Sequence, residues 1–317
     1  MAYQVGRATL RPYAHRFSPK KFTQPQLFAA LVLKEFLQFD YRKLSLFFRD
    51  AAEFRAVIGL HKVPHFTTFQ KAARRLMAYP RARRLLGTTI RIAVKRRRIR
   101  RRVALAALDG TGLESHHAST YYVRRRAAGG KTWQNTVYTR FPKAGVLCDC
   151  RSHLILAVVP GRGPRPDMRH FRAALDQALG VVRIDTMAAD AGYDSEGSHV
   201  YARQRWGVRM LIPPLAGRPT EKLPLGYWRR KMAVCLSHSR YGQRWQVETV
   251  ISMLKRLLGA ALRARKYWSQ CREIFLRALT LNIMILWWIR VFYRAAASPF
   301  RPPRPRSTSR NPEGQRR

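Results

Sequence analysis

The sequence is poor in acidic residues. Only 17 Asp and Glu accompany 62 Lys and Arg among its 317 residues, which gives a formal charge of +45. A compact protein with such an excess of one sign repels itself unless a polyanion offsets the charge. Nucleic acid meets this need, because cations that neutralise phosphates release counterions and bind with salt-sensitive affinity. The composition therefore predicts a polyanionic partner and leaves open which one.

Cysteine is also scarce, and charge-free apolar runs are missing. The four cysteines form no Cys-x-x-Cys pair and no disulfide framework, which is typical of a reduced, cytoplasmic compartment. The first residues have no apolar core of the signal-peptide kind. The apolar stretch 274–293 contains Arg277 and Arg290, and each arginine costs about 2–3 kcal/mol at a bilayer centre. We therefore expect a buried helix there and no membrane span.

Residues 1–98 have mostly helical apolar spacing, clearest at 24–37 and 41–48. The segment from residue 65 resembles a helix start capped by Thr67 or Thr68, followed by a basic amphipathic run at 71–77. These features suggest a helix-turn-helix-like domain for DNA binding or dimerisation, although a plain helical packing domain fits equally well. The arginine-rich run 95–102 is either a solvated linker or, as we favour, a phosphate contact beside the next domain.

Residues 99–293 alternate between strand and helix patterns. Short apolar or alternating runs predict strands, and periodic runs predict helices. The predicted strands are 103–108, 136–141, 146–159, 183–190 and 209–213, and the predicted helices are 168–179 (capped by Asp167), 198–206, 245–258 and 274–293. Loops are predicted at 160–166 and 214–227. This order indicates an α/β domain with a mixed sheet flanked by helices. Residues 294–317, rich in Arg, Pro and Ser, are expected to form a disordered basic tail.

Two aspartates follow apolar strands of this domain. Asp109 and Asp190 each end a predicted strand, and turn-forming residues come next. If the two strands are neighbours, their carboxylates meet at one edge of the sheet. Either residue could instead serve only its turn, a common use of aspartate. Asp194 competes with Asp190, but its position suits a cap for the helix that opens at Ser195.

A third carboxylate lies in the predicted helix 245–258. Arg244 precedes Glu248 by four residues, Tyr241 precedes it by seven and Lys255 follows it by seven. At about 100° per residue, these steps keep the four side chains on one stripe. The simplest interpretation is an i,i+4 ion pair on a solvated face. The alternative is a carboxylate held among cations that bind phosphate.

Three carboxylates that lie close together cannot all ionise without a cation. Carboxylate oxygens suit Mg²⁺ or Mn²⁺, and two such ions can activate a water or a 3′-hydroxyl for attack on a phosphodiester. His116 and His117 have no partners at zinc-site spacing, and Cys148 and Cys150 are interpreted as ordinary strand residues. No Gly-rich phosphate loop of the Walker type occurs, so no nucleotide cofactor is expected.

The stripe residues Tyr241, Arg244, Glu248 and Lys255 match the Y-(2)-R-(3)-E-(6)-K signature of bacterial insertion-sequence DDE transposases at all four positions. Upstream, segments 107–113 and 189–195 look like the first and second aspartate motifs of that family. The chain therefore resembles these transposases over about residues 103–290, and more loosely in its helical N-terminal part.

The resemblance implies an RNase H-like fold with Asp109, Asp190 and Glu248 as a triad that binds Mg²⁺ or Mn²⁺. It also implies that Tyr241, Arg244 and Lys255 hold phosphates of the transposon end. A homodimer on paired terminal inverted repeats would cut double-stranded DNA and join the 3′-hydroxyl to target DNA, in the nucleoid of a bacterial cytoplasm.

The segment between Asp190 and Glu248 is too short for the large β-domain that some relatives insert there. The sequence therefore does not support the hairpin-ended DNA intermediate that those relatives form. Trp228 could stack on a flipped base or pack on the core. Two other functions stay open: a non-catalytic DNA-binding protein, such as a degenerate copy acting as a repressor, and a structure-specific nuclease.

Overall fold

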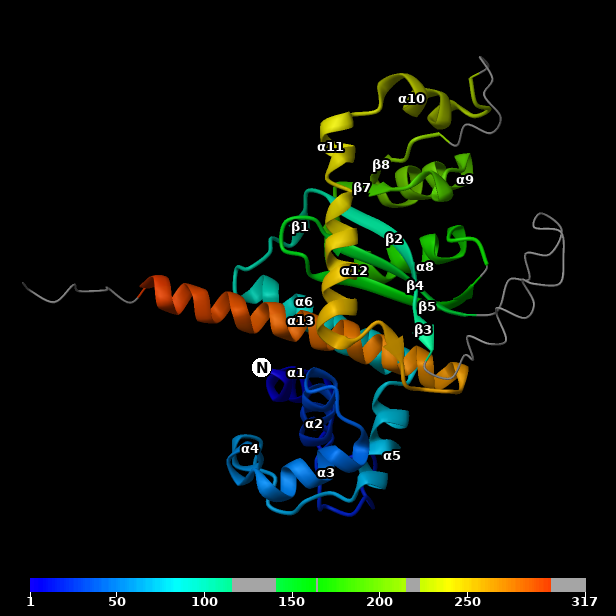
Figure 1. The fold of residues 1–317 in the computed structure, drawn as a ribbon. Coiled ribbons are helices and arrows are strands. Elements are labelled where there is room, and N and C mark those ends of the chain that lie inside the picture. Colours follow the sequence, from blue (N-terminus) through cyan, green and yellow to red (C-terminus); the bar gives the residue numbers. More distant parts are fainter. Residues whose placement is uncertain (116–140, 164, 215–222, 298–317) are drawn as a thin grey trace, which may run out of the picture.

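The computed structural model describes residues 1–115, 141–163, 165–214 and 223–297. The predicted strand segment 136–140 and the pair His116 and His117 lie outside these residues. Figure 1 shows an α/β body with a group of short helices beneath it, and one long helix that runs between the two.

The first part of the chain is helical, as predicted. Its helices are α1 (Ala2–Thr9), α2 (Gln24–Phe36), α3 (Tyr41–Asp50), α4 (Ala52–Val57), α5 (Phe66–Leu76) and α6 (Tyr79–Lys95). A capping box starts α2: the Thr23 side chain accepts from the Gln26 N–H, and the Gln26 side chain accepts from the Thr23 N–H.

The predicted threonine cap of α5 was wrong. The helix begins at Phe66 after the extended residue His65, so both Thr67 and Thr68 lie inside it. The Thr67 hydroxyl forms a hydrogen bond with the His65 ring at 2.9 Å instead of capping the backbone. The basic, amphipathic run predicted at 71–77 is nevertheless helical as far as Leu76, where α5 ends.

The body contains a five-stranded mixed sheet in the order β5-β4-β2-β7-β8. Its strands are β2 (Ala106–Gly112), β4 (Phe141–Asp149), β5 (Ile155–Gly163), β7 (Thr186–Ala189) and β8 (Arg209–Leu211). The pairs β2–β4 and β4–β5 are antiparallel, whereas β2–β7 and β7–β8 are parallel. The mixed sheet flanked by helices is confirmed, and its arrangement is consistent with an RNase H-like domain.

Two pairs of very short strands extend the body. They are β1 (Arg102–Val103) with β6 (Arg183–Ile184), and β3 (Glu114–Ser115) with β9 (Ala261–Leu262). The segment 183–190, predicted as one strand, is therefore divided between β6 and β7.

The hairpin β4–β5 lies elsewhere than predicted. The chain turns at residues 150–154, within the stretch 146–159 that was expected to be one strand. The Asp149 carboxylate stabilises this turn by accepting from the N–H groups of Arg151 and Ser152. Strand β5 also continues through Pro160 to Gly163, where a loop was predicted. Proline is tolerated there because β5 is an edge strand of the sheet.

Helices cover both faces of the sheet. They are α8 (Met168–Leu179), α9 (Glu196–Val200) with its continuation η2 (Tyr201–Arg205), α10 (Tyr227–Cys235), α11 (His238–Gly242), α12 (Trp245–Leu258) and α13 (Tyr267–Ala297). A short 3₁₀ turn, η1 (Ala191–Tyr193), follows β7. In Figure 1, α12 crosses the front of the sheet and α8 lies behind it. Helices α10 and α11 were not predicted, since the sequence patterns assigned a loop to 214–227 and no element to residues 228–240.

Asp167 precedes α8 as predicted but does not cap it with its side chain. Its carboxylate forms an ion pair with Lys143 of β4 at 2.8 Å. The carboxylate also fills the space where a side chain at Gly110 would lie, because an added Cβ there would come within 2.0 Å of it. Gly110 thus faces α8, and the alternation of side chains along β2 directs Asp109 to the other face, toward α12.

The buried closing helix is confirmed as α13, which begins before and ends after the predicted stretch 274–293. It continues to Ala297, so the first residues of the predicted tail are helical, and residues 298–317 lie outside the described chain. Among the described residues, no helix is long and apolar enough to cross a membrane.

Buried polar side chains of α13 join the helical part to the sheet. Arg277, 2% exposed, pairs with Glu35 of α2 at 3.1 Å and with Glu273 at 2.8 Å, and it donates to the Gly259 and Ala261 carbonyls. Asn282, fully buried, bonds both backbone groups of Ile155 in β5. Arg277, one of the two arginines that argued against a membrane span, thus has internal partners.

Replacing Arg277 should destabilise the whole fold. In Arg277→Met, Glu35 keeps only Lys34, and two partly buried carbonyls lose their donor. We expect the free energy of unfolding to fall by about 2–4 kcal/mol, measured by urea denaturation. The double variant Arg277→Met/Glu35→Gln, which removes the leftover charge, should recover part of this loss. An unchanged denaturation midpoint in Arg277→Met would contradict the role assigned to the network.

Candidate active site

The site begins at the pairing of β2 with β7. Their parallel register ends at Leu108 opposite Ala189, so Asp109 and Asp190 are the next residues on two neighbouring strands. Adjacent strands were the condition for the two aspartates to meet. One detail of the prediction was wrong, because Asp109 does not end its strand. Strand β2 continues to Gly112, since it stays paired with β4 beyond the point where β7 stops.

Asp190 serves the turn after β7, as the simpler interpretation proposed. Its carboxylate accepts from the Gly192 N–H at 3.0 Å and caps η1. Asp194 does not cap the following helix, and that prediction was wrong: the Ser195 side chain is the cap of α9. Asp194 instead forms an ion pair with Arg229 of α10 at 2.7 Å, and its side chain is fully buried. The rival aspartate is therefore engaged with a different helix.

The stripe predicted on one helix is divided between two. Tyr241 belongs to α11, and the chain makes tight turns at Gln243 and Arg244 before α12 begins at Trp245. Lys255 lies in the C-terminal half of α12, on the same face of the helix as Glu248. The periodicity therefore located the helix correctly from Trp245 onward, but it missed the break before it.

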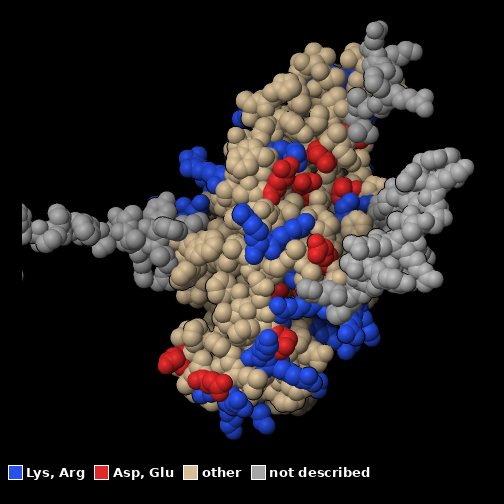
Figure 2. Space-filling view, in the orientation of Figure 1, with Lys and Arg blue, Asp and Glu red and all other residues tan. Residues whose placement is uncertain are grey.

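Arg244 connects the helix to the sheet. One terminal nitrogen of its guanidinium, Nη2, lies 2.5 Å from Glu248 Oε1, and the other, Nη1, lies 3.6 Å from Asp109 Oδ2. The i,i+4 ion pair of the simpler interpretation is thus present, but its cation is shared with a carboxylate of the sheet. Figure 2 shows the acidic side chains of this face gathered beside the upper half of α12, with Lys and Arg side chains next to them.

The carboxylates influence one another electrostatically. The pKa of Asp109 is raised to about 6, mainly by burial. The negative charges of Asp190 and Glu248 contribute to the rise, while the bond from the Gly110 N–H and the charge of Arg244 oppose it. Burial also raises the pKa of Tyr241, against the opposing effect of Arg244. The surroundings of Asp109 therefore stabilise its ionised form less than water does.

An open pocket of about 450 Å³ lies between β2 and α12. Its walls bring Asp109 and Glu248 together with Lys255, and they add Arg256, a cation that the sequence analysis had not singled out. The members that complete the lining are Gly110, Thr111, Ile251 and Ser252. The lining of this pocket thus combines two carboxylates with two cations.

A divalent ion fits the donor chemistry of this site but not its present side-chain positions. Within the described residues, no three His, Cys, Asp or Glu side chains lie close enough together to hold a metal ion. Arg244 is the cation between Asp109 and Glu248. The donors are carboxylate oxygens, which Mg²⁺ and Mn²⁺ prefer, and the Glu248 side chain is 54% exposed and has room to turn.

Trp228 is half-buried at the surface of the body. It lies on α10, and the Arg203 guanidinium covers its ring at 4.1 Å from the centroid. The carboxylate of Glu196 accepts from the N–H groups of Trp228 and Arg229 and so holds the start of α10. One face of the ring therefore already has a cation stacked on it.

A family model described as a transposase DDE domain matches residues 104–283, more than half of the chain. The matched span includes the strands and helices that carry Asp109, Asp190 and Glu248. No curated protein matches the chain.

Removing the Asp109 carboxyl should stabilise the protein in a pH-dependent way. Because its pKa rises from an ordinary 3.8 to about 6 on folding, the folded state holds the proton more tightly, and this group lowers stability as pH rises from about 4 to 6. Asp109→Asn should therefore be more stable than the parent at pH 7.5 by about 1–3 kcal/mol, and nearly equal to it at pH 4, in chelator-treated buffer.

The measurement is chemical denaturation at the two pH values. Asp50→Asn, which changes an exposed carboxylate on α3, is the matched control and should show little difference at either pH. A stability gain of Asp109→Asn that is the same at pH 4 and pH 7.5 would contradict the burial argument.

Proposed function

Since its match spans residues 104–283, the chain belongs to the transposase DDE domain family, and we propose that it cuts DNA at insertion-sequence ends and joins the freed 3′-hydroxyl to target DNA. The observation that carries the proposal is the pairing of β2 with β7, which makes Asp109 and Asp190 neighbours on a face that Glu248 shares through Arg244. Both reactions are attacks on phosphorus, so one site can serve for each.

Asp109, Asp190 and Glu248 would hold Mg²⁺ or Mn²⁺. Such ions activate the attacking oxygen and stabilise the leaving oxygen of a phosphodiester. The protein's own part is to supply the carboxylates from two rigid strands and one helix. In this proposal Glu248 turns from Arg244 toward Asp109, and its exposed side chain makes that change sterically simple.

Arg244, Lys255 and Tyr241 would hold the phosphates on either side of the cut. Arg244 is the most informative of them, because the guanidinium that now bridges two carboxylates can instead form paired hydrogen bonds with a phosphate. Lys255 and Arg256 line the same pocket as Asp109 and are the nearest cations for the next phosphate. The Tyr241 hydroxyl would act as a neutral hydrogen-bond donor, because burial raises its pKa.

The rest of the chain would serve DNA binding. We assign residues 1–98 to DNA contact or dimerisation, residues 99–293 to catalysis and the basic residues 294–317 to a tail. Helix α5 presents a basic last turn with Arg74 and Arg75, which suits contact with a phosphate backbone. Two copies would be needed to hold the paired inverted repeats of an element.

A non-catalytic DNA-binding protein is the second candidate. The observation in its favour is the ion pair of Arg244 with Glu248, together with the lack of a ready metal cluster among the described residues. The two candidates differ in what the carboxylates do when Mn²⁺ is supplied, and this difference can be measured.

Glu248→Gln should abolish cleavage while DNA binding persists. The variant keeps the size of the side chain and removes only its charge. Loss of metal-assisted charge stabilisation, worth several kcal/mol, corresponds to a rate lower by about 10²–10⁴-fold. The assay is Mn²⁺-dependent nicking of DNA that carries the gene's flanking inverted repeats, alongside a binding assay on the same DNA. Glu53→Gln, on α4 at the far end of the molecule (Figure 1), is the control and should cleave normally. Undiminished cleavage by Glu248→Gln would remove Glu248 from the mechanism.

Mn²⁺ should stabilise the parent protein through the same carboxylates. Binding at 100 times the dissociation constant adds about 2.7 kcal/mol to folding stability and raises the melting temperature accordingly. The shift should be much smaller in Asp109→Asn and in Asp190→Asn, and unchanged in Asp50→Asn. Equal shifts in all four proteins would show that Mn²⁺ binds elsewhere and would favour the non-catalytic candidate.

A further inference from the structure

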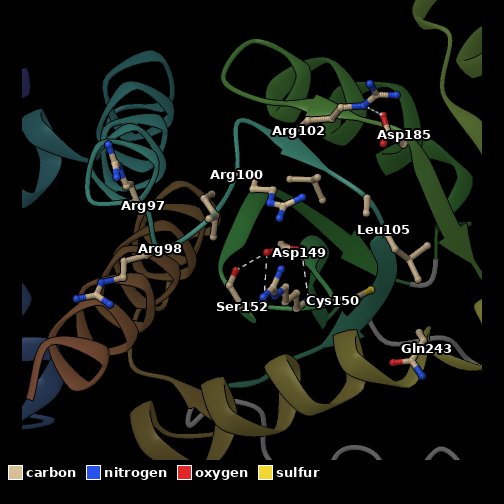
Figure 3. Close-up of a pocket in the computed structure, with 14 residues that line it drawn as sticks. Arg97, Arg98, Arg100, Arg102, Leu105, Asp149, Cys150, Ser152, Asp185 and Gln243 are labelled. Atoms are coloured by element: carbon tan, nitrogen blue, oxygen red, sulfur yellow. Dashed lines mark hydrogen bonds and ion pairs between the residues drawn. The ribbon is translucent and has the colours of Figure 1, made fainter. Parts of the chain in front are cut away.

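A second pocket, larger than the one at the carboxylates, lies at the arginine-rich segment between α6 and β2. It encloses about 960 Å³ and is lined by Arg97, Arg98, Arg100, Arg102 and Arg151, by Asp149 and Asp185, and by a less polar set (Ile99, Val103, Ala104, Leu105, Cys150, Ser152 and Gln243). Figure 3 shows Arg100 reaching into its middle, with Arg97 and Arg98 at the edge where α6 ends.

The two aspartates of this pocket are already engaged. Asp185 forms an ion pair with Arg102 at 2.6 Å. Asp149 accepts from the N–H groups of Arg151 and Ser152 and from the Ser152 hydroxyl at 2.6 Å, so the turn itself satisfies its charge. In the part of the chain that the structure describes, Arg97, Arg100 and Arg151 form no ion pair with an acidic residue. Arg100 and Arg151 thus add positive charge to a cavity whose two aspartates already have partners, and Arg97 lies at its edge.

The backbone at Arg97 gives an independent indication. Arg97 ends α6 in the left-handed region with φ of 56°, and the bonds from its N–H to Val94 and from the Arg98 N–H to Ala93 complete a glycine-type helix end. A side chain is strained in this conformation, and glycine is the residue that fits it without cost. An arginine at such a position motivates the hypothesis that its side chain has a role, which an Arg97 variant can test.

The pocket adjoins the candidate active site. Gln243, in its lining, is next to Arg244, and Leu105 lies four positions before Asp109 on the way into β2. The stretch from Leu105 to Asp109 spans roughly 13 Å, which is within the reach of a few nucleotides of one DNA strand. A strand with one phosphate at Asp109 could therefore present another phosphate to this pocket.

We propose that this arginine pocket binds the phosphodiester backbone of the reacting DNA, a few nucleotides from the phosphate that is attacked. The position of the DNA relative to the carboxylates rests on the proposed function. The binding of DNA at the pocket does not depend on it. The strand could be element DNA, its flank or the target, because all three present the same phosphates.

The test compares the full-length protein with Arg97→Gly/Arg100→Ala/Arg151→Ala by fluorescence anisotropy on a labelled DNA duplex, without divalent metal, over a range of salt concentrations. Each lost phosphate contact should lower the slope of log affinity against log salt by about 0.9, so the triple variant should lose roughly 2–3. Its affinity at moderate salt should fall by about 10-fold or more. Arg172→Ala removes an equally exposed cation on α8, where it stacks on Tyr201, and should leave the slope within about 1 of the parent.

Arg97→Gly alone separates a ligand contact from a structural role. Because glycine relieves the positive φ, this variant should melt about 1–3 °C higher than the parent and yet bind DNA more weakly. A residue that only supports the fold would show the opposite stability change. An unchanged salt slope in the triple variant, or an equal loss in Arg172→Ala, would overturn the proposal.

Methylphosphonate substitution at single positions then locates the contact. The parent should lose affinity when a phosphate a few steps from its mapped cleavage site is neutralised, and the triple variant should not respond at that position. The strand that carries the sensitive position identifies element, flanking or target DNA. Lack of cleavage by the parent, with the salt-slope difference intact, would refute the transposase function and leave the DNA-binding pocket standing.

Discussion

The parallel pairing of β2 with β7 is the constraint on which the candidate site depends. It sets Asp109 and Asp190 side by side, two like charges that would separate if the backbone allowed. Hydrogen bonds along β2, which is paired on both sides, hold Asp109 in place against that repulsion. The cost is visible in the raised pKa of Asp109, and Arg244 offsets it only in part. Although the chain has few acidic residues, three of them lie on one face of the body, where nearby cations would reduce their mutual repulsion.

The same need for charge balance organises the rest of the molecule in two different ways. Where a cation is buried for good, as with Arg277, the structure supplies two carboxylates and two carbonyls, and the charge is fully satisfied. Where cations line a pocket, as with Arg100 and Arg151, the structure leaves them without acidic partners among the described residues. This contrast is what connects the strong positive charge of the chain to DNA, since phosphates are the partners that complete the second group.

The helix α12 links the two pockets. On one side it carries Glu248 and Lys255 toward β2, and its start is held to the β4–β5 turn by a hydrogen bond of 2.5 Å between Gln246 and His153. That turn also carries Arg151 of the arginine pocket. DNA bound at the arginines would therefore contact the turn that is hydrogen-bonded to the start of α12. The same turn and helix would then support both DNA binding and the position of Glu248.

The sequence by itself determined the elements whose signal is local. Apolar periodicity located α2, α8 and α12, and the order of strand and helix patterns predicted the mixed α/β body. The spacing around Glu248 selected residues that share one side of the molecule. These predictions hold because periodicity and capping depend on neighbours within a few residues. Where two local signals competed, as at Thr67 or Pro160, the choice was wrong, because the cap and the edge position are set by the surrounding chain.

Only the tertiary structure decided which charges meet. The strand register that pairs Leu108 with Ala189, the guanidinium of Arg244 between two carboxylates and the arginine pocket all join segments far apart in the chain. Such contacts are fixed by how the sheet is ordered and by which strand lies at its edge. No pattern of nearby residues encodes that order, and so the sequence could name the charged residues but not their partners.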